Sequence, residues 1–77
     1  MPRRSKADAT AKAFGEAVNR VRAERGETLE QVAHRIDRMD EKYLGELVRG
    51  WHSPTISTAK RIADALEVSL AELVRDL

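Results

Sequence analysis

The chain has 77 residues, of which 42% are hydrophobic and 35% are charged, and it contains no cysteine. A chain of this length holds one domain with a limited core, and the absence of cysteine excludes disulfides and thiolate metal sites. No apolar run approaches the roughly 20 residues that cross a bilayer, and the first residues, MPRRSKADATAKAF, lack the apolar segment of a signal peptide. We therefore expect a cytoplasmic chain.

The net charge is only +1, but the charges are unevenly distributed. Residues 1–25 hold seven basic and three acidic side chains, whereas residues 26–77 hold seven and ten. We predict a flexible basic N-terminal arm over residues 1–8 and a single domain over residues 9–77. Such an arm can follow DNA phosphates or enter a minor groove, with Arg3 and Arg4 as its contacts. A solvated tail that aids solubility is the alternative interpretation.

An amphipathic helix is predicted from Ala9 to Arg25. Gly26 follows it and is the residue type that commonly stands after a helix C-terminus. The apolar side chains of this segment recur at three- and four-residue steps, which places them on one face: Phe14, Ala17, Val18 and Val21.

Residues 28–50, TLEQVAHRIDRMDEKYLGELVRG, predict two short helices joined by a tight turn. Thr28 and Gln31 have the spacing of a capping box, and Asp40 can cap the second helix. A pair of this kind is the usual way for a very small helical domain to present one helix to DNA. The apolar residues of both helices are spaced to point into one core: Leu29, Val32, Ala33, Ile36, Leu44, Leu47 and Val48.

Two further helices are predicted after Gly50 and the loop WHSP at residues 51–54. Thr55 can cap a helix that runs to about Leu66, and Ser69 can cap a last helix. The inward positions of the fourth helix are predicted to be Ile56, Ala59, Ile62, Ala63 and Leu66. Trp51 is expected to pack over the loop. Because no alternating strand pattern occurs, the chain is predicted to be all-α, with five helices around one core.

The order and spacing of several segments resemble the Cro/C1-type (Xre-like) helix-turn-helix family of bacterial and phage regulators. The segments, between about Phe14 and Val74, are RAERG, TLEQVA, YLGELVRG, HSPT and RIADALEVSLAEL. The resemblance implies a compact, five-helix lambda-repressor-like domain with the helix-turn-helix at its second and third helices. It also implies a sequence-specific DNA-binding transcriptional regulator, not an enzyme, that inserts residues 40–49 into the major groove as a dimer. Restriction-modification controllers, phage-type repressors and small antitoxins all belong to this family.

Carried onto this sequence, the family's base-reading positions are Glu41, Lys42 and Glu46, with Tyr43 beside them. Lys42 suits guanine O6 or N7, whereas a glutamate can accept only from the cytosine amino group. Glu41 has a second interpretation, in which it stabilises the helix N-terminus through the helix dipole. The candidate phosphate contacts outside the arm lie near the ends of this reading helix: Arg38, Arg49, His52 and Lys60.

The chain departs from the family pattern at three places. Leu29 stands where a glutamine usually contacts the DNA backbone. Val48 stands where an acid usually pairs with an arginine at the position of Arg22, so Arg22 needs another partner or remains solvated. The turn is one residue longer than usual and lacks its glycine, which leaves Asp37 or Arg38 to adopt any left-handed conformation.

The last helix carries an apolar stripe that one small core does not readily cover, so we expect it to form a homodimer interface: Leu70, Leu73, Val74 and Leu77. His34 and His52 are the only histidines, so no metal site or cofactor is predicted. No small-molecule ligand is evident. The alternative function is a protein-interaction module, antitoxin-like or otherwise, whose acidic reading helix binds a partner protein with weak or no DNA binding.

Overall fold

The computed structural model describes the backbone of residues 4–75 and 77, and side chains from residue 9 onward, residue 76 excepted. The described part of the chain contains five helices joined by turns and loops: α1 (Arg4–Glu24), α2 (Leu29–His34), α3 (Glu41–Val48), α4 (Ile56–Ala65) and α5 (Leu70–Val74). No strand occurs among these residues. The predicted all-α, five-helix fold is confirmed.

The N-terminal helix starts earlier than the sequence analysis predicts. α1 begins at Arg4, five positions before Ala9, so helical backbone enters the segment expected to form the arm. The alanines and lysines of this segment are good helix formers, and no proline or glycine follows Pro2 until Gly15. Arg3 lies outside the described residues, and Arg4 is described by its backbone alone.

The predicted caps begin the four shorter helices. The Thr28 hydroxyl accepts from the Gln31 backbone N–H at 3.1 Å, and the Gln31 side chain accepts from the Thr28 N–H at 2.8 Å, which completes the capping box. The Asp40 carboxylate accepts from the Tyr43 N–H at 2.8 Å. Thr55 and Ser69 cap α4 and α5 in the same way.

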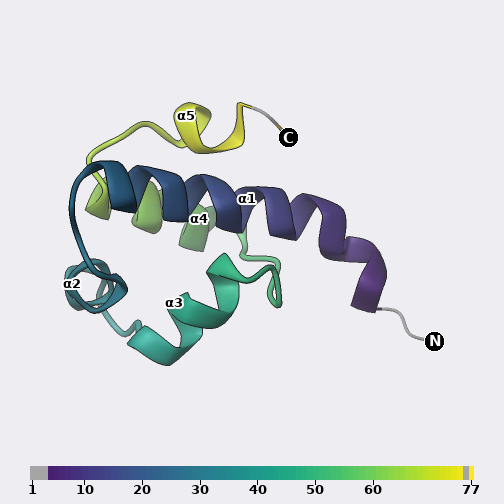
Figure 1. Ribbon diagram of the computed structural model, residues 1–77, viewed down its shortest axis with the longest axis horizontal. Coiled ribbons are helices and arrows are strands. Elements are labelled where there is room, and N and C mark those ends of the chain that lie inside the picture. The colour runs from purple at the N-terminus through teal and green to yellow at the C-terminus, as the bar shows by residue number, and fades with distance from the viewer. Residues whose placement is uncertain (1–3, 76) are drawn as a thin grey trace.

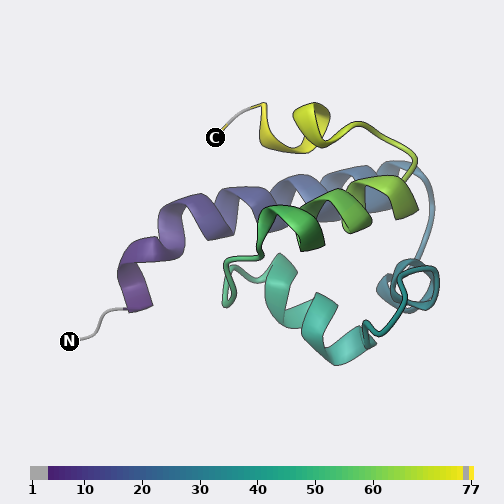
Figure 2. The same cartoon turned by 180° about the vertical axis from the view of Figure 1, so that it is seen from behind.

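The long helix α1 packs against α3 and α5, while α2 packs against α3 and α4 against α5 (Figure 1). α5 lies along one side of α1 and the α2–α3 pair on the other, and α4 runs in front of α1 in the view from behind (Figure 2). The largest fully buried side chains come from all five helices and their ends: Val18, Val32, Leu44, Leu47, Ile62, Leu66 and Leu73. Ile56 is the exception to the predicted core, because it lines a surface hollow between α1, α4 and α5 and is 79% exposed.

The crossing of α1 and α3 depends on Gly15. A Cβ atom at this position would lie 2.5 Å from the Leu47 carbonyl oxygen and 2.7 Å from that of Val48. Gly50 has a similar role at the end of α3, since its φ is +85° and a Cβ would lie 2.9 Å from the Lys12 Cα. The two glycines therefore let the C-terminal end of α3 lie close to α1.

A cluster of ionic groups fixes the start of the helix pair. The Glu27 carboxylate accepts from Arg25 Nε at 3.0 Å and from the Arg35 guanidinium, which also donates to the Ala65 carbonyl at 2.7 Å. These hydrogen bonds, that of Arg35 first, lower the pKa of Glu27 to about 2. The cluster links the segment before α2 to the C-terminal end of α4.

Within the described residues, no helix is long and apolar enough to cross a membrane.

Candidate nucleic-acid interface

The turn before α3 contains one residue in the left-handed conformation, although it has no glycine. Arg38 has a φ of +64°, so Arg38 rather than Asp37 takes this conformation. The Met39 N–H donates to the Ile36 carbonyl at 3.2 Å, and Asp40 then starts α3. Although the turn is longer than usual, α3 is therefore still a separate helix that is capped by Asp40 and packs beside α2.

The outward face of α3 borders a shallow hollow beside the start of α2. The hollow has a volume of about 400 Å³ and is lined by Leu29, Glu41, Lys42, Gly45, Glu46 and Arg49. Three of the four predicted base contacts, Glu41, Lys42 and Glu46, are thus brought together. Leu29, the residue in place of the usual glutamine, contributes apolar surface to the same hollow.

Glu46 is held by two basic side chains, Lys42 on the same helix and His52 beyond its end. His52 Nε2 lies 2.7 Å from its Oε1 atom, and Lys42 Nζ lies 3.7 Å from its Oε2 atom. The Glu46 side chain is only 22% exposed, against 85% for Lys42. The pKa of Glu46 is lowered, first by the hydrogen bond from His52, so the carboxylate stays ionised.

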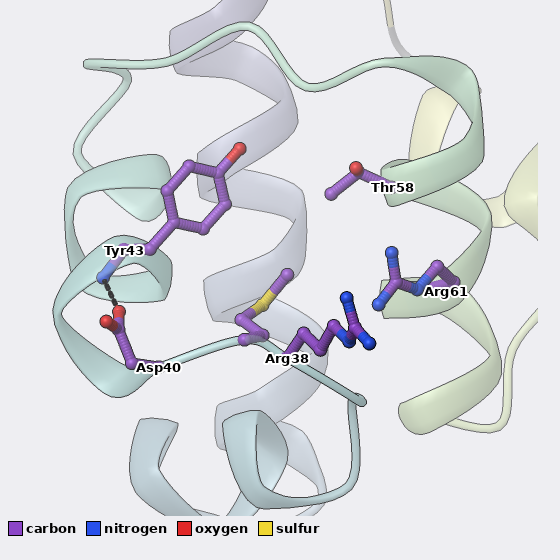
Figure 3. A pocket seen from close by; sticks show the side chains of 6 residues that line it. Arg38, Asp40, Tyr43, Thr58 and Arg61 are labelled. Carbon is purple, nitrogen blue, oxygen red and sulfur yellow. Dashed lines mark hydrogen bonds between the residues drawn. The ribbon is translucent and has the colours of Figure 1, made fainter.

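Tyr43 lies on a different side of α3 from Lys42. Its ring stacks on that of His52, with 5.0 Å between centroids and 15° between planes. It also lines a second hollow, of about 340 Å³, with Arg38, Met39, Asp40, Thr58 and Arg61. Figure 3 shows the side chains of Arg38 and Arg61 next to each other at the edge of this hollow. Tyr43 therefore supports His52 rather than sharing the hollow of the other base-contact candidates.

Trp51 does not pack over the loop as predicted. Its side chain is among the exposed large hydrophobics, at 64% exposure. His52 instead occupies the space against Tyr43 and Glu46, which turns Trp51 outward. The Arg49 guanidinium lies 5.3 Å from the centre of the Trp51 ring, a cation–π distance.

The phosphate-contact candidates differ in how much of each cation is already used. Arg38 is 88% exposed and its nearest acid, Asp37, is 3.9 Å away. Lys60 pairs with Asp64 at 2.9 Å, one turn along α4. His52 is bonded to Glu46, as described above, and the exposed Arg49 stacks on Trp51. Arg38 and Arg49 are therefore the more available cations of this group.

Arg22 finds a partner other than the acid usual in the family. Its guanidinium donates to the Glu27 carbonyl at 2.6 Å and to the Asn19 side chain at 3.0 and 2.8 Å. Val48 leaves no carboxylate at the end of α3, and the loop before α2 provides the acceptor instead. The expectation that Arg22 needs another partner is confirmed.

The residues predicted for a dimer interface divide into buried and exposed groups. Leu73 is 1% exposed and belongs to the core of its own chain, and Leu70 packs against that core. Val74 and Leu77 are 37% and 50% exposed. With Ile56, both line a mainly apolar hollow of about 180 Å³ between α1, α4 and α5. The surface open to a partner is therefore smaller than predicted on α5 and includes the start of α4.

Sequence comparison relates the chain to helix-turn-helix proteins. Residues 18–73 match the family model described as helix-turn-helix. The chain is 41% identical over 63 residues to the HTH-type transcriptional regulator y4dJ of Sinorhizobium fredii, a match that covers 82% of this chain and 80% of that protein.

Solved structures with the same fold are also regulators. The clp gene regulator ClgR from C. glutamicum has a TM-score of 0.81 and 30% identity, over 86% of this chain and 84% of that chain. The restriction-modification controller protein C.AhdI from Aeromonas hydrophila has a TM-score of 0.79 and 26% identity, over 84% and 97%. Both the sequence and the fold are therefore similar to those of helix-turn-helix regulators.

Proposed function

We propose that this chain, which belongs to the Cro/C1-type helix-turn-helix family of transcriptional regulators, binds a specific DNA site as a homodimer with α3 in the major groove. The observation that carries the proposal is the outward face of α3, which presents Lys42 and Arg49 beside the start of α2. An α-helix fits the major groove, where base edges differ in their donors and acceptors. A regulator of this kind acts in the cytoplasm, where the DNA lies.

The proposed contacts divide into base readers and phosphate contacts. Glu41, Lys42 and Glu46 face the bases, and Tyr43, the fourth candidate, supports His52 from another side of α3. The cations around α3 and in the arm face phosphates, which fix the position of the protein and set its salt dependence: Arg3, Arg4, Arg38, Arg49, His52 and Lys60. Among the four whose side chains are described, Arg49 makes no ion pair, and the highly exposed Arg38 lies at the long distance of 3.9 Å from Asp37.

The homodimer is proposed to form through the exposed apolar residues around the hollow between α4 and α5. Ile56, Val74 and Leu77 are exposed, and Leu70 lies beside them. An exposed apolar patch on a small protein commonly marks an interaction surface. A two-fold dimer places two copies of α3 into half-sites about 34 Å, one DNA turn, apart.

Selection of bound sequences from random DNA with the purified protein tests this function. We expect enrichment of a two-fold symmetric site and binding that weakens steeply as salt rises. Failure to enrich any sequence at low salt would contradict the proposal.

A protein-interaction module remains the second candidate, because α3 begins with two acids and Trp51 is largely exposed. Asp40 and Glu41 oppose a polyanion, and exposed tryptophans often anchor protein partners. The double variant Lys42→Ala and Arg49→Ala separates the candidates. DNA regulation predicts that this variant loses DNA binding, whereas an interaction module keeps its partner binding unchanged.

A further inference from the structure

We propose that Lys42 and Glu46 together read one C·G base pair, and that His52 is the positioning residue that sets Glu46 for this role. The inference rests on the proposed function, since it requires α3 to lie in the major groove. It adds the identity of the base pair and its orientation relative to the helix.

The Lys42–Glu46 pair offers a donor beside an acceptor on the open face of α3. Lys42 Nζ and Glu46 Oε2 are 3.7 Å apart, and both side chains line the same hollow. A C·G pair offers the complementary groups: the cytosine N4 amino group donates, and guanine O6 accepts. These two base atoms are joined by an N–H···O bond of about 2.9 Å. The 3.7 Å between the two side-chain atoms is close enough to the distance between the two base atoms for Lys42 and Glu46 to contact both bases of one pair.

The flanking groups favour C·G over A·T. An A·T pair also places a donor, adenine N6, next to an acceptor, thymine O4. Adenine N7, however, is an acceptor beside N6 and repels a carboxylate, and the thymine methyl lies beside O4. In the C·G pair the second acceptor, guanine N7, lies beside O6, where the three donors of an ammonium can use it. Because Lys42 precedes Glu46 by one helical turn, the pair also distinguishes C·G from G·C.

His52 determines which oxygen of Glu46 is free. Its Nε2 atom is 2.7 Å from Oε1, and its ring is held against Tyr43 at 5.0 Å. Oε2 therefore remains as the acceptor on the Lys42 side. The Lys42 ammonium also reduces the repulsion between the Glu46 carboxylate and the DNA phosphates, because it offsets the negative charge of that carboxylate.

The test compares the selected sites of the wild type with those of Glu46→Gln. We expect the wild type to prefer C·G by about tenfold or more at one position of each half-site, which corresponds to one good base contact. Glutamine instead suits adenine N6 and N7, so the variant should change that position to A·T and keep the others. Glu24→Gln is the matched control, because Glu24 is an exposed acid of α1 outside the base-reading face, and it should keep C·G at this position.

The role of His52 is tested at the same base position. His52→Ala should reduce the C·G preference there without reducing discrimination elsewhere, and His52→Gln, whose amide can donate in place of Nε2–H, should restore it. A purely structural role would weaken binding to all sites equally and would overturn the part assigned to His52. An unchanged site for Glu46→Gln, with native helical content by circular dichroism, would overturn the inference alone. Failure of the wild type to select any site would overturn the proposed function and the inference together.

Discussion

Glu27 shows at the scale of one residue how the helix pair is anchored. Its carboxylate accepts from Arg25 and Arg35, and the latter also holds the Ala65 carbonyl. No local sequence rule predicts this cluster, because Arg35 and Ala65 are 30 residues apart. The backbone carbonyl of Glu27 accepts from Arg22, which has no acid at position 48 to pair with.

The first prediction concerns the pH dependence of stability. The pKa of Glu27 is lowered from 4.5 to about 2 in the folded chain, so its carboxylate stabilises the fold above pH 4.5. This contribution is lost as the pH falls from 4.5 to about 2. We expect Glu27→Gln to lower the free energy of unfolding at pH 7 and to make its decline in that acid range shallower. Urea denaturation at several pH values measures both effects.

The exposed acid Glu30 provides the control for this prediction. Glu30→Gln should leave the acid decline as it is in the wild type. Equal pH profiles for Glu27→Gln and the wild type would contradict the assignment of the decline to Glu27.

A substitution of Arg38 is expected to have opposite effects on the stability of the fold and on DNA binding. Its φ of +64° is unfavourable for a residue with a side chain, and the side chain itself is 88% exposed. Arg38→Gly should therefore stabilise the fold by about 1 kcal/mol. If Arg38 contacts a phosphate, the same change should weaken DNA binding and reduce its logarithmic salt slope by about one.

Thermal denaturation and binding titrations at several salt concentrations check the two halves of this prediction. Arg38→Lys is the matched variant, since it keeps both the charge and the backbone strain and should change neither quantity much. An unchanged salt slope for Arg38→Gly would remove Arg38 from the phosphate contacts.

At the scale of elements, the starts of the four capped helices were predictable, whereas the start of α1 and the contacts between elements were not. Thr28, Asp40, Thr55 and Ser69 all cap helices as predicted, because a cap is made within four residues. The sequence likewise limited the left-handed residue to Asp37 or Arg38, and Arg38 takes that conformation. These features depend on neighbouring residues, which the sequence displays directly.

The features that the sequence did not predict join separate elements. Ile56 follows the apolar spacing of α4 but lines a surface hollow where it is largely exposed, so periodicity alone assigns it to the core wrongly. Trp51 is exposed because His52 takes the position against Tyr43, a choice that depends on how the loop leaves α3. Gly15 has no local requirement for glycine, and its role appears only where α3 crosses α1.

The α1–α3 crossing can be tested with two glycines that differ in their surroundings. A Cβ at Gly15 would lie 2.5 Å from the Leu47 carbonyl oxygen, whereas a Cβ at Gly45 would have Arg49 Nη1, at 3.7 Å, as its nearest contact. Gly15→Ala should therefore destabilise the fold by about 1–3 kcal/mol through overpacking. Gly45→Ala should stabilise it by about 1 kcal/mol through helix propensity.

Chemical denaturation of the two alanine variants measures this difference. Because both substitutions add the same methyl group to a helical glycine, helix propensity cancels in the comparison. Equal stabilisation by the two would contradict the close approach of the α1 and α3 backbones.

At the scale of the whole molecule, the chain uses one surface for α3 and another for its exposed apolar residues. The first contains Lys42 and Arg49, and the second contains Ile56, Val74 and Leu77. In a two-fold dimer, the second surface sets the separation of the two copies of the first. The proposed function therefore predicts that the affinity for a symmetric DNA site depends on residues that touch no DNA.

The last prediction tests this dependence with Ile56→Lys. Because Ile56 is 79% exposed, the change should leave the core of the monomer intact while it places a charge in the proposed interface. We expect sedimentation to change from dimer to monomer and the affinity for a two-half-site DNA to fall much more than the affinity for a single half-site. Ser57→Lys adds the same charge at the next exposed position, which does not line the apolar hollow, and should preserve the dimer. A wild type that sediments as a monomer, or a dimer that survives Ile56→Lys, would place the interface elsewhere or remove it.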